Sequence, residues 1–216
     1  MFYSFLKSIP STVKVVAVSK TQSCETIQQA YDNGLRVFGE NKPQELVKKY
    51  NTLPKDIEWH FIGHLQTNKV KYIVPFVELI HSVDSPKLLD AINKEAAKCN
   101  RQILCLLQVH IAEEETKFGF SVGELIEYLS TAKFREYTFI KIAGLMGMAT
   151  YTNDKAKIRN EFRILHQTFD TLKKTIFANN PAFCQLSMGM SNDYEIAITE
   201  GSTIIRIGSL IFGERS

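Results

Sequence analysis

Eight short apolar runs that alternate with segments of helical spacing constrain the fold of this chain more than any other feature. The runs occupy residues 13–19, 36–40, 57–63, 77–83, 103–111, 139–148, 183–189 and 203–212. They are rich in β-branched residues, which is typical of strands buried on both faces of a parallel sheet. The segments with helical spacing are residues 25–33, 43–50, 67–73, 86–98, 122–134, 154–176 and 192–200.

Strands that alternate with helices in this way predict one α/β domain over residues 1–216, a (β/α)8 barrel of the TIM type. An open doubly wound sheet is the alternative. Since the last run reaches residue 212, we expect no helix after it. The N-terminal residues Phe2, Phe5, Leu6 and Ile9 have helical spacing. We expect this stretch to pack across the seam between the first and last strands, the alternative being a frayed tail.

Charge and cysteine content exclude several classes of function. The formal net charge is +3, and the lysines are scattered, so no nucleic-acid-binding stripe is expected. The four cysteines form no CxxC pair, which favours reduced thiols. No apolar run approaches the length of about 18 residues that a membrane span needs, and no signal peptide is recognisable. We therefore expect a cytoplasmic protein that binds neither nucleic acid nor membrane.

Lys20 directly follows the first apolar run, in the stretch VKVVAVSK. In a barrel of this kind the carboxyl ends of the strands form the functional face, so Lys20 is expected at the barrel mouth. Desolvation there would lower the pKa of an amine, and a neutral amine can attack an aldehyde to form an imine. The alternative is a lysine whose stem packs while its ammonium reaches solvent.

Two glycine–serine turns mark the last two units. Gly189 and Ser191 precede an expected helix, and Gly208 and Ser209 lie near the end of the last strand. Barrels often bind a phosphate with the loops at these positions, although two ordinary turns are the alternative. Arg206 lies within the apolar stretch TIIRIGSLIF and needs a partner if buried. That partner is either a carboxylate, such as Glu200 or Glu214, or an acceptor atom of a ligand.

Other polar clusters carry less information. His60 and His64 are four residues apart in WHFIGH, but no third ligand has suitable spacing, so we expect no metal site. The three glutamates at residues 113–115 are expected in a solvated loop. A lysine that traps aldehydes, a phosphate site and a buried arginine together suggest a phosphorylated aldehyde. Pyridoxal 5′-phosphate meets all three requirements.

The chain also resembles a known family over nearly its whole length, the YggS/PROSC group of pyridoxal phosphate homeostasis proteins. The resemblance is carried by VAVSKT, FGEN, WHFIGHLQTNK, HSVDS, LQVHIAEEETKFGF, GLMGMAT and LSMGMSNDYEIAITEGSTIIRIGSLIFG, in this order. It implies a barrel similar to the N-terminal domain of alanine racemase. It also implies a Schiff base on Lys20, Asn41 beside the cofactor and Arg206 facing the pyridine nitrogen. By the same resemblance the remaining cofactor-binding positions are Ser187, Gly208 and Ser209 for the phosphate, with Met188 and His64 lining the pocket.

Two classes of function follow from the resemblance. The first is a carrier of pyridoxal phosphate that takes part in vitamin B6 homeostasis, a monomer that passes the cofactor to apo enzymes. The second is a pyridoxal phosphate-dependent amino-acid racemase or related enzyme. Racemisation needs an acid/base group on each face of the substrate, and alanine racemase takes one from a further domain that we do not expect here. An arginine beside the ring nitrogen also weakens the electron sink for carbanion chemistry. We therefore expect a carrier without catalysis.

Overall fold

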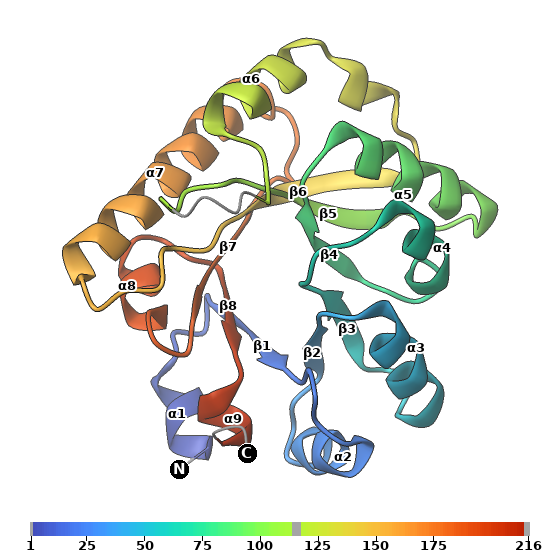
Figure 1. Ribbon diagram of the computed structural model, residues 1–216, viewed down its shortest axis with the longest axis vertical. Coiled ribbons are helices and arrows are strands. Elements are labelled where there is room, and N and C mark those ends of the chain that lie inside the picture. Colours follow the sequence, from blue (N-terminus) through green and yellow to red (C-terminus); the bar gives the residue numbers. More distant parts are fainter. Residues whose placement is uncertain (1, 114–117, 214–216) are drawn as a thin grey trace.

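Eight parallel strands close into a barrel in the computed structural model of this chain, which describes residues 2–113 and 118–213 (Figure 1). The strands are β1 (Lys14–Val18), β2 (Val37–Glu40), β3 (Glu58–Phe61), β4 (Leu79–Val83), β5 (Ile103–Gln108), β6 (Ile140–Met146), β7 (Gln185–Met190) and β8 (Ile204–Ile207). Each strand pairs with the next, and β1 pairs with β8, with Val16 opposite Arg206. The predicted barrel is thus confirmed, and the open sheet is excluded.

Helices connect the strands and form the outer layer. They are α1 (Phe2–Ser8), α2 (Cys24–Asp32), α3 (Pro43–Thr52), α4 (Val70–Ile73), α5 (Pro86–Lys98), α6 (Val122–Ser130), α7 (Lys155–Lys174), α8 (Tyr194–Thr199) and α9 (Ser209–Phe212), with short 3-10 turns η1 (Thr67–Lys69) and η2 (Lys133–Glu136). Capping residues in the sequence explain where several of these helices begin. Ser85 caps α5, whose first residue is Pro86, and Ser121 with Glu124 forms a capping box at α6.

Two apolar layers explain why the strands are hydrophobic on both faces. The barrel interior is a small cluster of buried residues, namely Val16, Leu79, Leu106, Ala143, Met146 and Ile204. A larger cluster lies between the barrel and the helices and includes Phe38, Trp59 and Phe162. Because successive side chains of a strand point to opposite faces, one strand can supply both layers, as β4 does with Leu79 and Ile80.

The last apolar run does not continue as a strand. It was expected to be a strand over residues 203–212 without a following helix, and this prediction was wrong. β8 ends at Ile207, and the chain turns into α9, where Phe212 N–H donates to Gly208 O at 2.9 Å. Apolar residues continue through both elements, and short apolar runs have no period that separates strand from helix.

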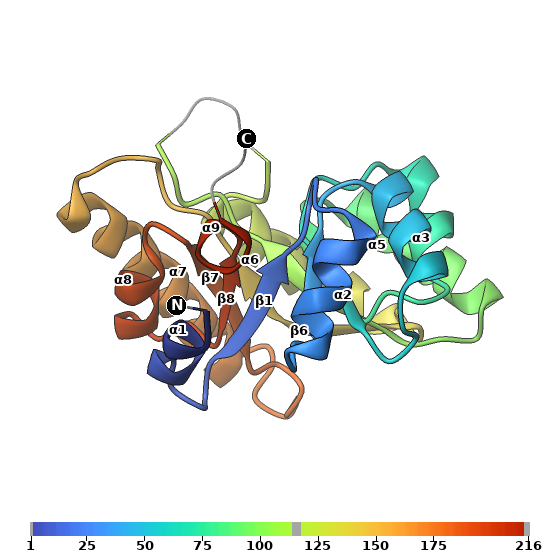
Figure 2. The same ribbon diagram turned by 90° about the horizontal axis from the view of Figure 1, so that it is seen from below.

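The N-terminal stretch forms the expected helix on the outside of the barrel near the seam between β1 and β8. In Figure 2, α1 lies beside α9, and the two helices are in contact. The Phe5 ring meets the Tyr194 ring of α8 edge to face, with 5.4 Å between their centroids, and Leu6 packs against the outer core. No helix in the described ranges has both the length and the apolar character that a membrane crossing requires. Of the three glutamates at residues 113–115, the last two lie outside the described residues.

Candidate functional site

A cavity of about 900 Å³ opens at the carboxyl ends of the strands. Its walls come from the residues that follow β1 and β2, from segments 148–153 and 190–193 after β6 and β7, and from the end of β8. This is the face on which barrels of this type carry their functional groups.

Lys20 lies on one wall of this cavity, just beyond the end of β1. The preceding residue, Ser19, is fully buried, and its N–H donates to Gly39 O of β2 at 3.0 Å. Asn41 follows β2 and lines the cavity next in order. The Asn41 side-chain Oδ1 is buried and has no hydrogen-bond partner among the described residues. It is therefore an acceptor that a ligand in the cavity could use.

Arg206 approaches the cavity from β8 and is almost fully buried. Its Nη1 donates to Ser187 Oγ at 2.7 Å, and its Nη2 donates to Gly147 O at 3.1 Å. Burial lowers the pKa of Arg206 to about 10, against an opposing effect of Asp193. The guanidinium thus stays protonated at neutral pH, while both of its hydrogen-bond acceptors are neutral groups.

Of the two carboxylates expected as partners of Arg206, the one that the structure describes, Glu200, has other partners. Glu200 accepts a hydrogen bond from Arg159 at 2.8 Å and lies 3.4 Å from Arg163 Nε, and Glu214 lies outside the described residues. Asp193, which lines the cavity, accepts from the Met190 N–H at 2.5 Å. Burial raises the pKa of the Asp193 carboxyl, while the Met190 hydrogen bond and the charge of Arg206 oppose that shift.

A chain of neutral hydrogen bonds continues from Arg206 into the barrel interior. Ser187 Oγ lies 2.9 Å from His81 Nδ1, and His81 Nε2 lies 2.9 Å from His60 Nδ1. Burial lowers the pKa of His60 to about 3 and that of His81 well below its usual value, so both rings are neutral. Because Ser187 Oγ already accepts a hydrogen bond from Arg206, its hydroxyl donates to His81 Nδ1. The Nε2–H of His81 then donates to His60 Nδ1.

The two glycine–serine turns meet at the rim of the cavity. Gly208 N–H donates to Ser191 Oγ at 3.3 Å, and both residues line the cavity together with Ser209. Gly189 has φ +96°, and a Cβ there would lie 2.5 Å from Ala197 Cβ, so α8 can pack closely only against glycine. The end of β8 and the start of α9 therefore form one wall with the turn after β7.

Five of the eight predicted binding residues line this cavity: Lys20, Asn41, Arg206, Gly208 and Ser209. Ser187 lies beneath Arg206 in the hydrogen-bonded chain. Met188 is fully buried in the outer core. His64 stands outside the cavity, with Nδ1 3.0 Å from Asp84 Oδ2 and its ring 4.4 Å from that of Phe118. His60 and His64 do not come together, because β3 ends at Phe61.

Several cavity residues were not among those predicted. Segment 148–153 after β6 forms a large part of the wall, and Asp193 contributes a carboxyl group. The stretch GLMGMAT already placed small residues at this strand end. The described residues contain no group of three or more histidine, cysteine, aspartate or glutamate side chains that could hold a metal ion.

Known proteins resemble this chain over almost its whole length. Residues 3–216 match the family profile described as "Alanine racemase, N-terminal domain". The "Pyridoxal phosphate homeostasis protein" of Aquifex aeolicus (strain VF5) is 46% identical over 206 residues, which cover 94% of this chain and 87% of that protein. PipY of Synechococcus elongatus PCC7942 without PLP (pyridoxal phosphate) is 33% identical with a TM-score of 0.90, covering 98% of this chain and 97% of PipY. The structure of PipY with PLP bound is 32% identical with a TM-score of 0.87 and the same coverage.

Proposed function

Since the chain belongs to the alanine racemase N-terminal domain family and, by its relatives, to the pyridoxal phosphate homeostasis proteins, we propose that it binds pyridoxal 5′-phosphate covalently through Lys20. It holds the cofactor in the cavity at the barrel mouth and takes part in vitamin B6 homeostasis. The PLP-bound structure of PipY supports this proposal, because that protein matches 98% of the chain.

The observation that carries the proposal is a protonated, buried guanidinium in the same cavity as Lys20. Arg206 has two neutral hydrogen-bond acceptors and sits on β8, which pairs with the strand that leads to Lys20. A ligand with an aldehyde for the amine, a ring nitrogen for the guanidinium and an anionic phosphate fits these groups. The buried, unpartnered Oδ1 of Asn41 adds an acceptor on the adjacent wall.

The chemistry needs only one reactive group of the protein. Bound pyridoxal phosphate supplies an aldehyde, and the Lys20 nitrogen bonds to the aldehyde carbon while the aldehyde oxygen leaves as water. Release is the reverse hydrolysis, which returns the amine and the free aldehyde. Arg206 would donate to the ring nitrogen, and Gly208 and Ser209 would hold the phosphate, since all three line the cavity.

We expect a carrier without catalytic turnover rather than a racemase, and the names of the relatives are the main support for this choice. Because Arg206 remains protonated up to a pKa of about 10, it donates to a ring nitrogen and leaves that nitrogen unprotonated. An unprotonated ring withdraws electrons weakly, which disfavours carbanion chemistry. This effect alone does not separate the two classes, because the racemase family that the chain resembles shares the arginine. The printed names of the relatives are those of homeostasis proteins. We expect the chain to act as a monomer in the cytoplasm and to release the cofactor to apo enzymes.

Borohydride trapping tests the proposal directly. Reduction of the protein loaded with pyridoxal phosphate should leave a pyridoxyl adduct on Lys20, identified by peptide mass spectrometry. Lys20→Ala should fold and lose the adduct. Lys155→Ala is a matched control, because Lys155 lines the same cavity from the start of α7. An adduct on Lys155 in the unmodified chain would contradict the assignment.

Two assays separate the carrier from the enzyme. A carrier should restore the activity of an apo enzyme added to the loaded protein and should not exchange the α-protons of amino acids with solvent. Sustained α-proton exchange that disappears in Lys20→Ala would establish the racemase-type alternative instead.

A further inference from the structure

The backbone around Lys20 adopts a conformation that needs support. Gln22 N–H donates to Ser19 O at 3.0 Å, so Lys20 and Thr21 occupy the two central positions of a tight turn. Thr21 has φ +68°. This left-handed conformation is unfavourable for a β-branched residue and persists only when surrounding contacts fix it. The direction of the Lys20 side chain depends on this turn.

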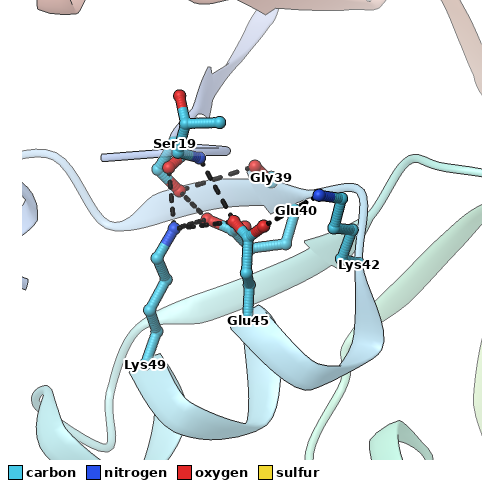
Figure 3. Close-up of polar contacts among 7 residues, drawn as sticks. Ser19, Gly39, Glu40, Lys42, Glu45 and Lys49 are labelled. Atoms are coloured by element: carbon cyan, nitrogen blue, oxygen red, sulfur yellow. Dashed lines mark hydrogen bonds and ion pairs between the residues drawn. The ribbon is translucent and has the colours of Figure 1, made fainter. Parts of the chain in front are cut away.

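Lys49 of α3 holds the residue that precedes Lys20. Its buried ammonium donates to Ser19 O and to Glu40 Oε1, both at 2.8 Å (Figure 3). Ser19 Oγ donates to the same Glu40 oxygen at 2.6 Å. One lysine therefore ties the backbone and, through Glu40, the side chain of Ser19 to β2 and α3.

Glu45 of α3 holds the residue that follows Lys20. Thr21 N–H donates to Glu45 Oε2 at 3.2 Å, and Lys49 Nζ lies 3.7 Å from the same oxygen. The side chains of Glu40, Glu45 and Lys49 thus contact the turn on both sides of Lys20.

Stability alone does not account for a charged network at this place. Glu40 is fully buried, and Lys49 is nearly so. Burial raises the pKa of Glu40, against the opposing hydrogen bonds from Lys49 and Ser19. A buried ion pair gains little over apolar residues of similar volume, because both charges lose their hydration. Neither Glu40 nor Lys49 lines the cavity, so neither is in a position to bind the ligand itself.

We propose that Lys49, Glu40 and Glu45 are positioning residues that fix the turn bearing Lys20, so that its amine meets the aldehyde of the ligand. The inference rests on the proposed function and adds these three residues to it. They act through Ser19 and Thr21 and do not touch the ligand.

The test replaces the ion pair by apolar residues of similar size, in Lys49→Met/Glu40→Leu. The free energy of unfolding should stay near that of the unmodified protein or rise, because no buried charge is left unpaired. Covalent capture of pyridoxal phosphate by Lys20, followed by stopped-flow absorbance, should slow by roughly 10- to 100-fold, because displacement of a reacting group by about 1 Å has an effect of this size. If the ion pair served only to stabilise the fold, a variant of unchanged stability would also capture pyridoxal phosphate at the unmodified rate.

Lys14→Met is the matched control. Lys14 lies on the same strand, at the end opposite the cavity, and pairs with Glu58 at 3.1 Å. This variant should capture pyridoxal phosphate at the rate of the unmodified protein.

Glu45→Gln provides a second, milder variant, because this side chain is partly exposed and remains an acceptor for Thr21 N–H. It should fold and slow capture by a few-fold. Capture at the unmodified rate by the folded double variant would overturn the inference. If the double variant does not fold, the same result for Glu45→Gln would overturn it. Failure of the proposed function is seen separately, as the absence of a Lys20 adduct in the unmodified protein.

Discussion

The two walls of the cavity support their cationic side chains in different ways. Beside Lys20, the network contains two carboxylates, Glu40 and Glu45, and a buried ammonium. Beside Arg206, the acceptors are a hydroxyl and a backbone carbonyl, and behind them lie two neutral imidazoles. The first wall pairs its carboxylates with a buried ammonium and holds a backbone turn. Within the part of the chain that the structure describes, the second wall gives the guanidinium no hydrogen-bonded anion, and its charge can serve a ligand.

The largest expected effect comes from removing the charge of the second wall. Arg206→Leu should weaken the binding of pyridoxal phosphate by roughly 10- to 100-fold, because a hydrogen bond to a charged group contributes about 1.5–3 kcal/mol. Equilibrium titration by absorbance measures this loss. Arg206→Lys keeps a positive charge but not the geometry of two parallel donors. Its affinity should therefore lie between those of Arg206→Leu and the unmodified protein. Unchanged affinity in Arg206→Leu would mean that the guanidinium charge does not serve the ligand. The two walls would then not differ in the way described above.

Breaking the neutral chain should have the next largest effect. His81→Leu removes one hydrogen-bond partner of the Ser187 hydroxyl and one of His60 Nδ1. The free energy of unfolding should fall by about 1–3 kcal/mol, the range for a buried polar group left unsatisfied. Chemical denaturation measures it, and His81→Gln, which keeps polar atoms, should lose less.

Low pH should reduce the free energy of unfolding through the buried histidines of the second wall, in a pH range set by the pKa of His60. The pKa of His60 falls from its ordinary 6.5 to about 3 on folding, so the unfolded chain binds more protons between these values. Stability should therefore decrease as the pH falls through 6.5, by about 1 kcal/mol between pH 6.5 and 5.5 for His60 alone. Glu40 on the first wall acts in the opposite sense, because burial raises its pKa and protonation relieves the cost of that burial.

Denaturation at a series of pH values checks this difference. A His60→Gln/His81→Gln variant should lose less stability between pH 6.5 and 5 than the unmodified chain. An identical pH dependence in the two proteins would mean that these histidines are not kept neutral by burial.

The smallest effect should come from a partly exposed ion-pair cluster that belongs to neither wall. Glu200→Gln weakens contacts with Arg159 and Arg163 on the outer surface. The change in unfolding free energy should be within about 1 kcal/mol, as for other partly exposed pairs, and cofactor affinity should not change. A large loss of affinity would mean that Glu200 and its arginine partners also support the cofactor site.

The comparison also shows which features a sequence can predict. The strands were predictable because burial on both faces leaves long apolar runs. Lys20 drew attention because it follows such a run, and Arg206 because it lies within one. Met188 was placed in the pocket, yet it faces the outer core while its neighbour Ser187 points inward. A shift of one residue along a strand exchanges the two faces, and the register of β7 against β8 shifts between Ser187 and Met190.

The supports of the two walls were not predictable, for a different reason. Ser187 meets His81 across 106 positions of the chain, and Lys49 meets Ser19 across 30. No local pattern records such contacts, since they form only when strands and helices far apart in the sequence pack together. Lys49 occupies a helix with ordinary amphipathic spacing, where a lysine reads as a solvated residue.

The pairing of β1 with β8 sets an order of events during synthesis. Lys20 follows the first strand of the barrel and Arg206 lies on the eighth, so the two proposed ligand groups cannot face each other before β8 has been synthesised. Capture of a ligand by both groups would therefore wait for circular closure of the sheet.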